Sequence, residues 1–186
     1  MQHYRLARDL EIAVVDGLRF FGNQCRLPVG PLREPISRLN TVDLVVVNNP
    51  QASSSPVDNF PSFGMQLKPS AWRQLQNQHI ISLNDLTFEK NLHAVAGIGN
   101  PQRFFNTLDS LSLTYTAHTF ADHHKFTSGD FQFLNDAQVV MTEKDAVKCQ
   151  PFAKSTWYSL IVNAQLDTEF WQKFQQKLDS IQSTKP

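Results

Sequence analysis

Cysteine is scarce in this sequence, which has 186 residues and only two cysteines, Cys25 and Cys149. They are far apart and form no C-x-x-C pair, so the pattern excludes a disulfide scaffold and indicates reduced thiols in a cytosolic setting. Net charge is absent as well, since 17 lysines and arginines face 17 aspartates and glutamates. No overall field draws the protein to nucleic acid, and we expect neither a nucleic-acid partner nor a disulfide-linked one.

Long apolar runs are also missing. No segment approaches the roughly 20 residues that cross a bilayer, and the first residues lack the apolar core of a signal peptide. For this chain alone we therefore expect no membrane anchor and a soluble, cytoplasmic location. The phosphate-binding motif G-x-x-x-x-G-K-[ST] does not occur anywhere in the sequence.

Arginine, in contrast, is concentrated in the first forty residues, whereas all nine lysines come from Lys68 onward. The early arginines are Arg5, Arg8, Arg19, Arg26, Arg33 and Arg38. A guanidinium group offers a planar fork of donors that suits phosphate or carboxylate, so this bias favours an anionic ligand. Ordinary surface ion pairs explain the same bias equally well, with Asp9, Glu11, Asp16 and Glu34 as partners.

The segment 16–39 combines these arginines with residues that set the backbone. Its fixed or unusually free positions include Pro28, Gly30, Pro31 and Pro35. Such spacing predicts a well-defined loop rather than a flexible one. The charged side chains that this loop presents are Arg26, Arg33, Glu34 and Arg38.

The order of the elements predicts an α/β fold. The β-branched runs 11–16 and 42–48 are typical of buried parallel strands, and ligands gather beyond the carboxyl ends of such strands. Further strands are expected at 63–67, 92–96, 113–120, 138–142 and 158–162, and helices at 101–111, 131–134 and 167–181. We expect two domains, with a parallel-sheet core at 1–90 and a smaller Rossmann-like layer at 91–186.

Three later motifs are ambiguous. The turn 97–101, Gly-Ile-Gly-Asn-Pro, suits either a phosphate cradle or a tight structural turn. The cluster Asp122-His123-His124 with Asp130 suits acid/base chemistry, metal binding or a surface turn. Residues 142–145, Thr-Glu-Lys-Asp, lie where a parallel sheet presents ligands, but a helix cap with Thr142 as the N-cap explains them without function.

Several motifs follow one another along the chain: Gln2 to Asp9, Val15-Asp16-Gly17, Phe21-Gly22-Asn23, Leu27-Pro28, Gly30 to Pro35, Gly97 to Pro101, Asp122 to His124 and Thr142 to Asp145. Together they resemble the tetraacyldisaccharide 4'-kinase family of lipid A biosynthesis. The resemblance covers nearly the whole chain. It implies a P-loop kinase-type sheet and transfer of the γ-phosphoryl group of ATP, with Mg²⁺, to the 4'-hydroxyl of a lipid A disaccharide precursor at the cytoplasmic face of the inner membrane.

The resemblance also implies roles for single residues. His123 corresponds to a histidine that orients a catalytic aspartate, and Gln2 lies beside the segment expected near ATP and Mg²⁺. Arg33, Glu34 and Asn23 are expected to contact the substrate, with Arg33 as donor and Glu34 as its orienter or as an acceptor for sugar hydroxyls.

The sequence departs from the family pattern at two turns and in its extent. Gln24 stands where the family has glycine, and Asn48-Asn49 stands for Asn-Gly. The chain resembles the C-terminal half of the family, without the phosphate-binding loop or the Mg²⁺ aspartates, so we expect negligible kinase turnover by this polypeptide alone. A non-catalytic module that binds anionic glycolipid and a non-functional gene remnant remain alternatives.

Overall fold

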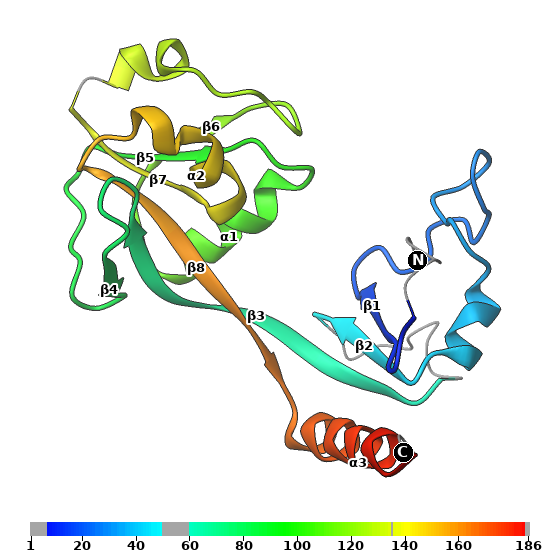
Figure 1. The fold of residues 1–186 in the computed structure, drawn as a ribbon. Coiled ribbons are helices and arrows are strands. Elements are labelled where there is room, and N and C mark those ends of the chain that lie inside the picture. The colour runs from blue at the N-terminus through cyan, green and yellow to red at the C-terminus, as the bar shows by residue number, and fades with distance from the viewer. Residues whose placement is uncertain (1–6, 50–59, 135, 185–186) are drawn as a thin grey trace. The chain divides into compact units, whose positions relative to one another are not determined.

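The computed structural model describes residues 7–49, 60–134 and 136–184. It forms two compact units, Met1–Leu67 with Ala164–Pro186, and Lys68–Asn163. Two long strands, β3 (Ser62–Gln74) and β8 (Trp157–Leu166), continue from one unit into the other (Figure 1). The two units are defined by contacts, and the predicted folding domains 1–90 and 91–186 stay a prediction.

The first unit contains the β-branched strands that the sequence predicts. β1 (Ile12–Asp16) pairs in parallel with β2 (Leu44–Asn48), and β2 pairs in parallel with the start of β3. One side of β2 packs against Val15 and Phe21, near the 3-10 helix η1 (Ile36–Thr41). The other side packs on Phe170 of helix α3 (Thr168–Thr184). Because both faces are covered, the uninterrupted apolar run of β2 is buried.

The second unit is a layered α/β arrangement. β5 (Leu92–Ala96) lies between β6 (Thr116–Thr119) and β7 (Gln138–Thr142), and β7 pairs with β8, all in parallel. Helix α1 (Pro101–Ser110) covers one face with Phe104, Phe105 and Leu108. The other face packs against α2 (Glu143–Cys149), η2 (Ser128–Leu134) and η3 (Gln150–Phe152). The predicted α/β class with a mostly parallel sheet is confirmed.

Several local predictions differ from the structure, among them β6, which is shorter than the expected 113–120, and β8, which is longer than the expected 158–162. β3 has 13 residues, whereas the pattern predicts only 63–67, and the antiparallel strand β4 (Ile80–Ser82) is not predicted. β3 is held by its two neighbours β2 and β8, which are distant in sequence, so its local pattern carries little signal. The helix expected at 131–134 is the 3-10 helix η2.

Candidate functional site

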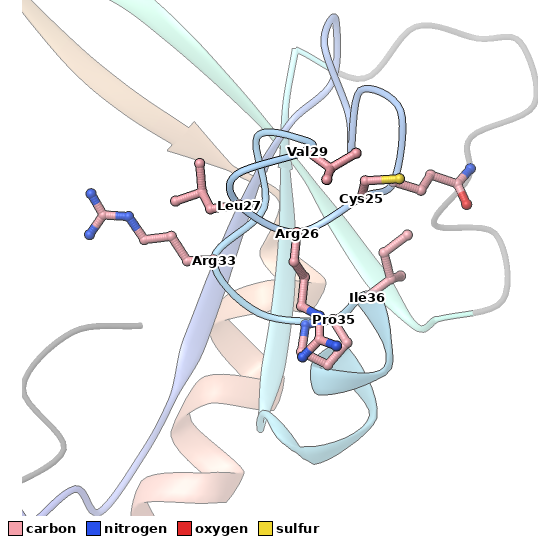
Figure 2. Close-up of a pocket in the computed structure, with 8 residues that line it drawn as sticks. Cys25, Arg26, Leu27, Val29, Arg33, Pro35 and Ile36 are labelled. Atoms are coloured by element: carbon pink, nitrogen blue, oxygen red, sulfur yellow. The ribbon is translucent and has the colours of Figure 1, made fainter.

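An open hollow of about 700 Å³ lies in the loop between β1 and η1 of the first unit (Figure 2). Its lining consists of Gln24, Cys25, Arg26, Leu27, Val29, Arg33, Pro35 and Ile36. The loop follows the carboxyl end of a parallel strand, which is where α/β proteins commonly bind ligands. The hollow therefore coincides with the arginine-rich loop that the sequence singles out.

Side chains and turns hold the loop in shape. The Asp16 carboxylate accepts a hydrogen bond from the Leu18 N–H at 2.9 Å, which starts the turn after β1. The Asn23 side chain accepts from the Cys25 N–H at 3.1 Å and donates to the Val29 carbonyl at 3.0 Å. A Cβ atom on Gly30 would lie 2.2 Å from the Asn23 Oδ1, so only glycine fits there. The side chain of Asn23, which is expected to contact the substrate, therefore stabilises the loop by these hydrogen bonds.

The two departures from the family pattern have a backbone explanation. Gln24 has φ 62° and Asn49 has φ 60°, so both stand in the left-handed region that glycine adopts without strain. Asparagine tolerates this region better than most residues. The backbone therefore keeps the conformation of a glycine turn at Gln24, at a cost in strain that glycine would not incur.

The arginines of this region fall into two kinds. Arg38 is in ion pairs, with its Nη2 2.5 Å from Glu11 Oε2 and its Nε 3.3 Å from Glu34 Oε2. Glu34 thus pairs with Arg38, and its predicted role as the orienter of Arg33 or as an acceptor for sugar hydroxyls stays a prediction. Within the described ranges, the guanidinium groups of Arg26 and Arg33 have no hydrogen bond or ion pair, and both line the hollow.

Glu11 is the centre of the paired group. Hydrogen bonds from Arg38 and then from Arg8, at 2.8 Å, hold the pKa of the Glu11 carboxyl below its usual value. Surface ion pairing, the plain explanation of the arginine bias, is therefore correct for Arg8 and Arg38. It does not account for Arg26 and Arg33, whose donors stay available to an anion.

In the second unit, His123 joins two motifs that are separate in the sequence. Its Nδ1 lies 3.0 Å from Asp122 Oδ1 and 3.3 Å from Lys144 Nζ, and the lysine also lies 3.2 Å from Asp122 Oδ1. The Lys144 hydrogen bond is the main reason why the pKa of Asp122 is lowered. The His123 side chain is 74% exposed, so this imidazole can reach a group outside the described chain.

His124 points differently from its neighbour. Its Nε2 lies 3.4 Å from Asp130 Oδ2, an ion-pair distance without hydrogen-bond geometry, and its ring packs on Phe120 and Phe126. His123 and His124 therefore face different surroundings, as expected for adjacent residues. The described residues contain no group of three or more His, Cys, Asp or Glu side chains that could hold a metal ion.

The glycine turn at 97–101 is filled by the protein itself. The fully buried carboxylate of Asp145 accepts hydrogen bonds from the Gly97 N–H at 2.9 Å and from Thr142 Oγ1 at 2.8 Å. Lys148 Nζ lies 3.0 Å from its other oxygen. Thr142 also caps α2 by accepting from the Asp145 N–H at 3.2 Å. The structural interpretations of both motifs are thus supported, because the carboxylate occupies the Gly97 N–H that a phosphate cradle would offer to a ligand.

Comparison with known proteins decides the family. The sequence model of LpxK, tetraacyldisaccharide-1-P 4'-kinase, matches residues 1–179. The chain belongs to this family. A tetraacyldisaccharide 4'-kinase of Methylobacillus flagellatus is 47% identical over 97% of this chain and 52% of its own length. One of Pseudomonas entomophila is 45% identical over 100% of this chain and 54% of its own length.

A solved structure confirms that this chain has the fold of the kinase family. LpxK of Aquifex aeolicus, crystallised in complex with ATP, superposes with a TM-score of 0.73 at 23% identity, over 97% of this chain and 55% of that one. The chain spans about half the length of the curated relatives it matches. Gln2, which the resemblance places near ATP and Mg²⁺, lies outside the described residues. In the described part, no helix is both long and apolar enough to span a bilayer.

Sequence reasoning missed two features of these sites. The role of Asp145 as the acceptor of the Gly97 N–H depends on a contact across 48 positions of sequence, and no local pattern signals it. The exposed apolar side chains of Leu27 and Val29 were also missed. Their signal was available, because the run 27–31 contains no charged residue although it lies in a loop.

Proposed function

We propose that this chain supplies the arginine loop of an enzyme that transfers the γ-phosphoryl group of ATP to the 4'-hydroxyl of a tetraacyldisaccharide 1-phosphate in lipid A biosynthesis. The enzyme acts at the cytoplasmic face of the inner membrane, with ATP and Mg²⁺ bound mainly by residues outside the described chain. The observation that carries this proposal is the hollow, where Arg26 and Arg33 stand without partners in the described chain in a member of this kinase family.

Phosphoryl transfer depends mainly on positioning and on neutralising negative charge. Arg33 is proposed to donate to a phosphate of the substrate, and Asn23 keeps the loop in the receiving shape. Glu34, already paired with Arg38, accepts from a sugar hydroxyl. His123 orients a catalytic carboxylate outside this chain, with Asp122 and Lys144 fixing its ring.

Binding of the disaccharide 1-phosphate to the purified chain, measured by calorimetry, tests the role of Arg33. Arg33→Ala should weaken binding by about tenfold to a hundredfold, since a charge-assisted hydrogen bond contributes roughly 1.5–3 kcal/mol. Arg33→Lys should recover only part of the loss, because an ammonium group lacks the planar fork. Arg19→Ala removes the same charge from an exposed site outside the hollow lining and is the matched control.

Equal binding by the parent chain and Arg33→Ala would show that the substrate does not use the hollow. A parent chain that binds no disaccharide phosphate would overturn the binding proposal as a whole.

Catalysis by the purified 186-residue chain is expected to be negligible, because its sequence contains no G-x-x-x-x-G-K-[ST] motif. Detectable ATP-dependent phosphorylation of the disaccharide would contradict this. A non-catalytic glycolipid-binding module is the second candidate, favoured by the same unpaired arginines. It predicts disaccharide binding by a protein in which no nucleotide binding can be measured.

A further inference from the structure

The tip of the arginine loop is unusually apolar. Residues 27–31, Leu-Pro-Val-Gly-Pro, carry no charged or polar side chain. Leu27 is 60% exposed and Val29 is 74% exposed. Single exposed apolar side chains are common on protein surfaces, but two of them on one proline-containing loop tip form a small apolar patch.

The backbone of this tip is satisfied from within. The Leu27 N–H donates to the Leu32 carbonyl at 2.8 Å, and the N–H groups of Val29 and Gly30 donate to the Arg26 carbonyl at 3.0 and 3.1 Å. The other two tip residues are prolines, which have no N–H. Every amide donor of 27–31 is therefore paired or absent, so the tip can enter an apolar medium without burying an unpaired donor.

Positive charge borders the tip on both sides. Arg26 precedes it and Arg33 follows it, and residues 17–33 contain no aspartate or glutamate. In the described chain both guanidinium groups lack partners. Figure 2 shows the side chains of Leu27 and Arg33 extending to the same side of the loop. Apolar side chains flanked by cations are the pattern that binds the boundary between anionic headgroups and acyl chains.

We infer that the tip 27–31 inserts into the surface of an anionic lipid bilayer, with Leu27 and Val29 among the acyl chains and Arg26 and Arg33 at the headgroups. The inference rests on the membrane part of the proposed function and names the surface that carries it. Hydrogen bonds and prolines already hold the backbone of the tip in one conformation. This favours insertion, because little conformational freedom is lost when the loop binds.

Co-sedimentation of the 186-residue chain with vesicles tests this docking. The vesicles contain phosphatidylcholine with or without phosphatidylglycerol and no lipid A precursor. The parent chain should bind the anionic vesicles, and Val29→Asp should weaken that binding by about tenfold or more. Val147→Asp is the matched control, because Val147 is 73% exposed on α2 of the other unit. Leu27→Ser checks that the loss follows from lost apolar area rather than from added negative charge.

Equal melting temperatures of the parent and the variants exclude a folding defect. The inference is overturned if the parent chain ignores anionic vesicles, or if Val29→Asp binds them as well as Val147→Asp does. If the parent chain binds vesicles of pure phosphatidylcholine as strongly as it binds anionic vesicles, the proposed role of the arginines is overturned. Binding of a short-chain, water-soluble disaccharide phosphate by the parent chain, measured without vesicles, separates these outcomes from failure of the proposed function, since that binding requires no bilayer.

Discussion

Two strands of this protein end in loops of the kind that bind ligands, and the two loops differ in whether the protein itself occupies their hydrogen-bond donors. The turn after β5 has its Gly97 N–H bound by the buried carboxylate of Asp145. The loop after β1 keeps Arg26 and Arg33 without partners in the described chain, beside an open hollow. Both follow parallel strands, so position in the sheet alone does not identify a binding site.

The difference lies in which donors remain available. At the β5 turn, the carboxylate of Asp145 is itself held by Thr142 and Lys148, so the Gly97 N–H has a fixed acceptor within the protein. At the β1 loop, the local donors are guanidinium groups that no described carboxylate reaches. A glycine-rich turn therefore indicates a ligand site only when its donors are unpaired in the folded chain.

Removing Asp145 should break the filled turn most severely. Asp145→Ala leaves the Gly97 N–H, the Thr142 hydroxyl and Lys148 without their acceptor, and we expect a loss of about 3 kcal/mol in the free energy of unfolding. Urea denaturation measures the loss. Asp136→Ala is the control, because the Asp136 side chain is 98% exposed and forms a surface ion pair with Lys154. Similar losses in both variants would mean that the filled turn is not a stabilising unit.

A methyl group at Gly97 should have the next largest effect. Its Cβ would lie 2.9 Å from Cζ of Phe126 and 3.3 Å from Asp145 Oδ1. Phe126 is buried, so the ring has little room to move, and Gly97→Ala should cost roughly 1–3 kcal/mol. Gly129→Ala serves as the control, since its nearest contact, Thr127 Oγ1, is at an ordinary 3.5 Å. A Gly97→Ala variant as stable as the control would show that the turn is loosely packed.

The sequence predicts the buried parallel strands well. The limits of β5 and β7 match the prediction, and those of β1 and β2 differ by one or two residues. A β-branched run carries a strong local signal where both faces are buried, as in β2, whereas β1, also expected to be buried, leaves Val14 61% exposed. Helix α1 is predicted by Pro101 at its first position and by the apolar stripe that contains its two phenylalanines. The full length of β3 and the presence of β4 could not be predicted, since their pairing depends on partners elsewhere in the chain.

The candidate site was predicted only in part, for a similar reason. The proline and glycine spacing identifies the loop, but it does not separate Arg33 from Arg38. Glu34 is four residues before Arg38 and could be suspected as a partner, whereas Glu11 is 27 positions away. Which arginine is available to a ligand is decided by that distant contact.

The pH dependence of stability should separate the paired arginine from the unpaired one. Arg38 lowers the pKa of Glu11 in the folded state, so this contribution is complete above the unfolded pKa of about 4.3 and is lost as the pH falls through the folded value. Arg38→Ala should reduce the melting temperature at pH 7 and make its decline below about pH 4 shallower. Arg33→Ala should match the parent at every pH. Identical pH profiles for all three proteins would contradict the assignment of Arg38 to the ion pairs.

The two thiols offer the mildest test of the same contrast, because labelling them need not change stability. Cys25 is exposed in the hollow, whereas Cys149 is buried in α2, where burial and then the charge of Asp145 raise its pKa to about 12. Since the thiolate is the reactive form, one thiol per folded chain should react with a disulfide reagent at about pH 8, and both should react in denaturant. Cys25→Ser should abolish the reaction of the folded protein. Two reactive thiols in the folded chain would mean that the unit containing the filled turn opens readily. If added disaccharide phosphate slows the labelling of Cys25, the ligand binds in the hollow.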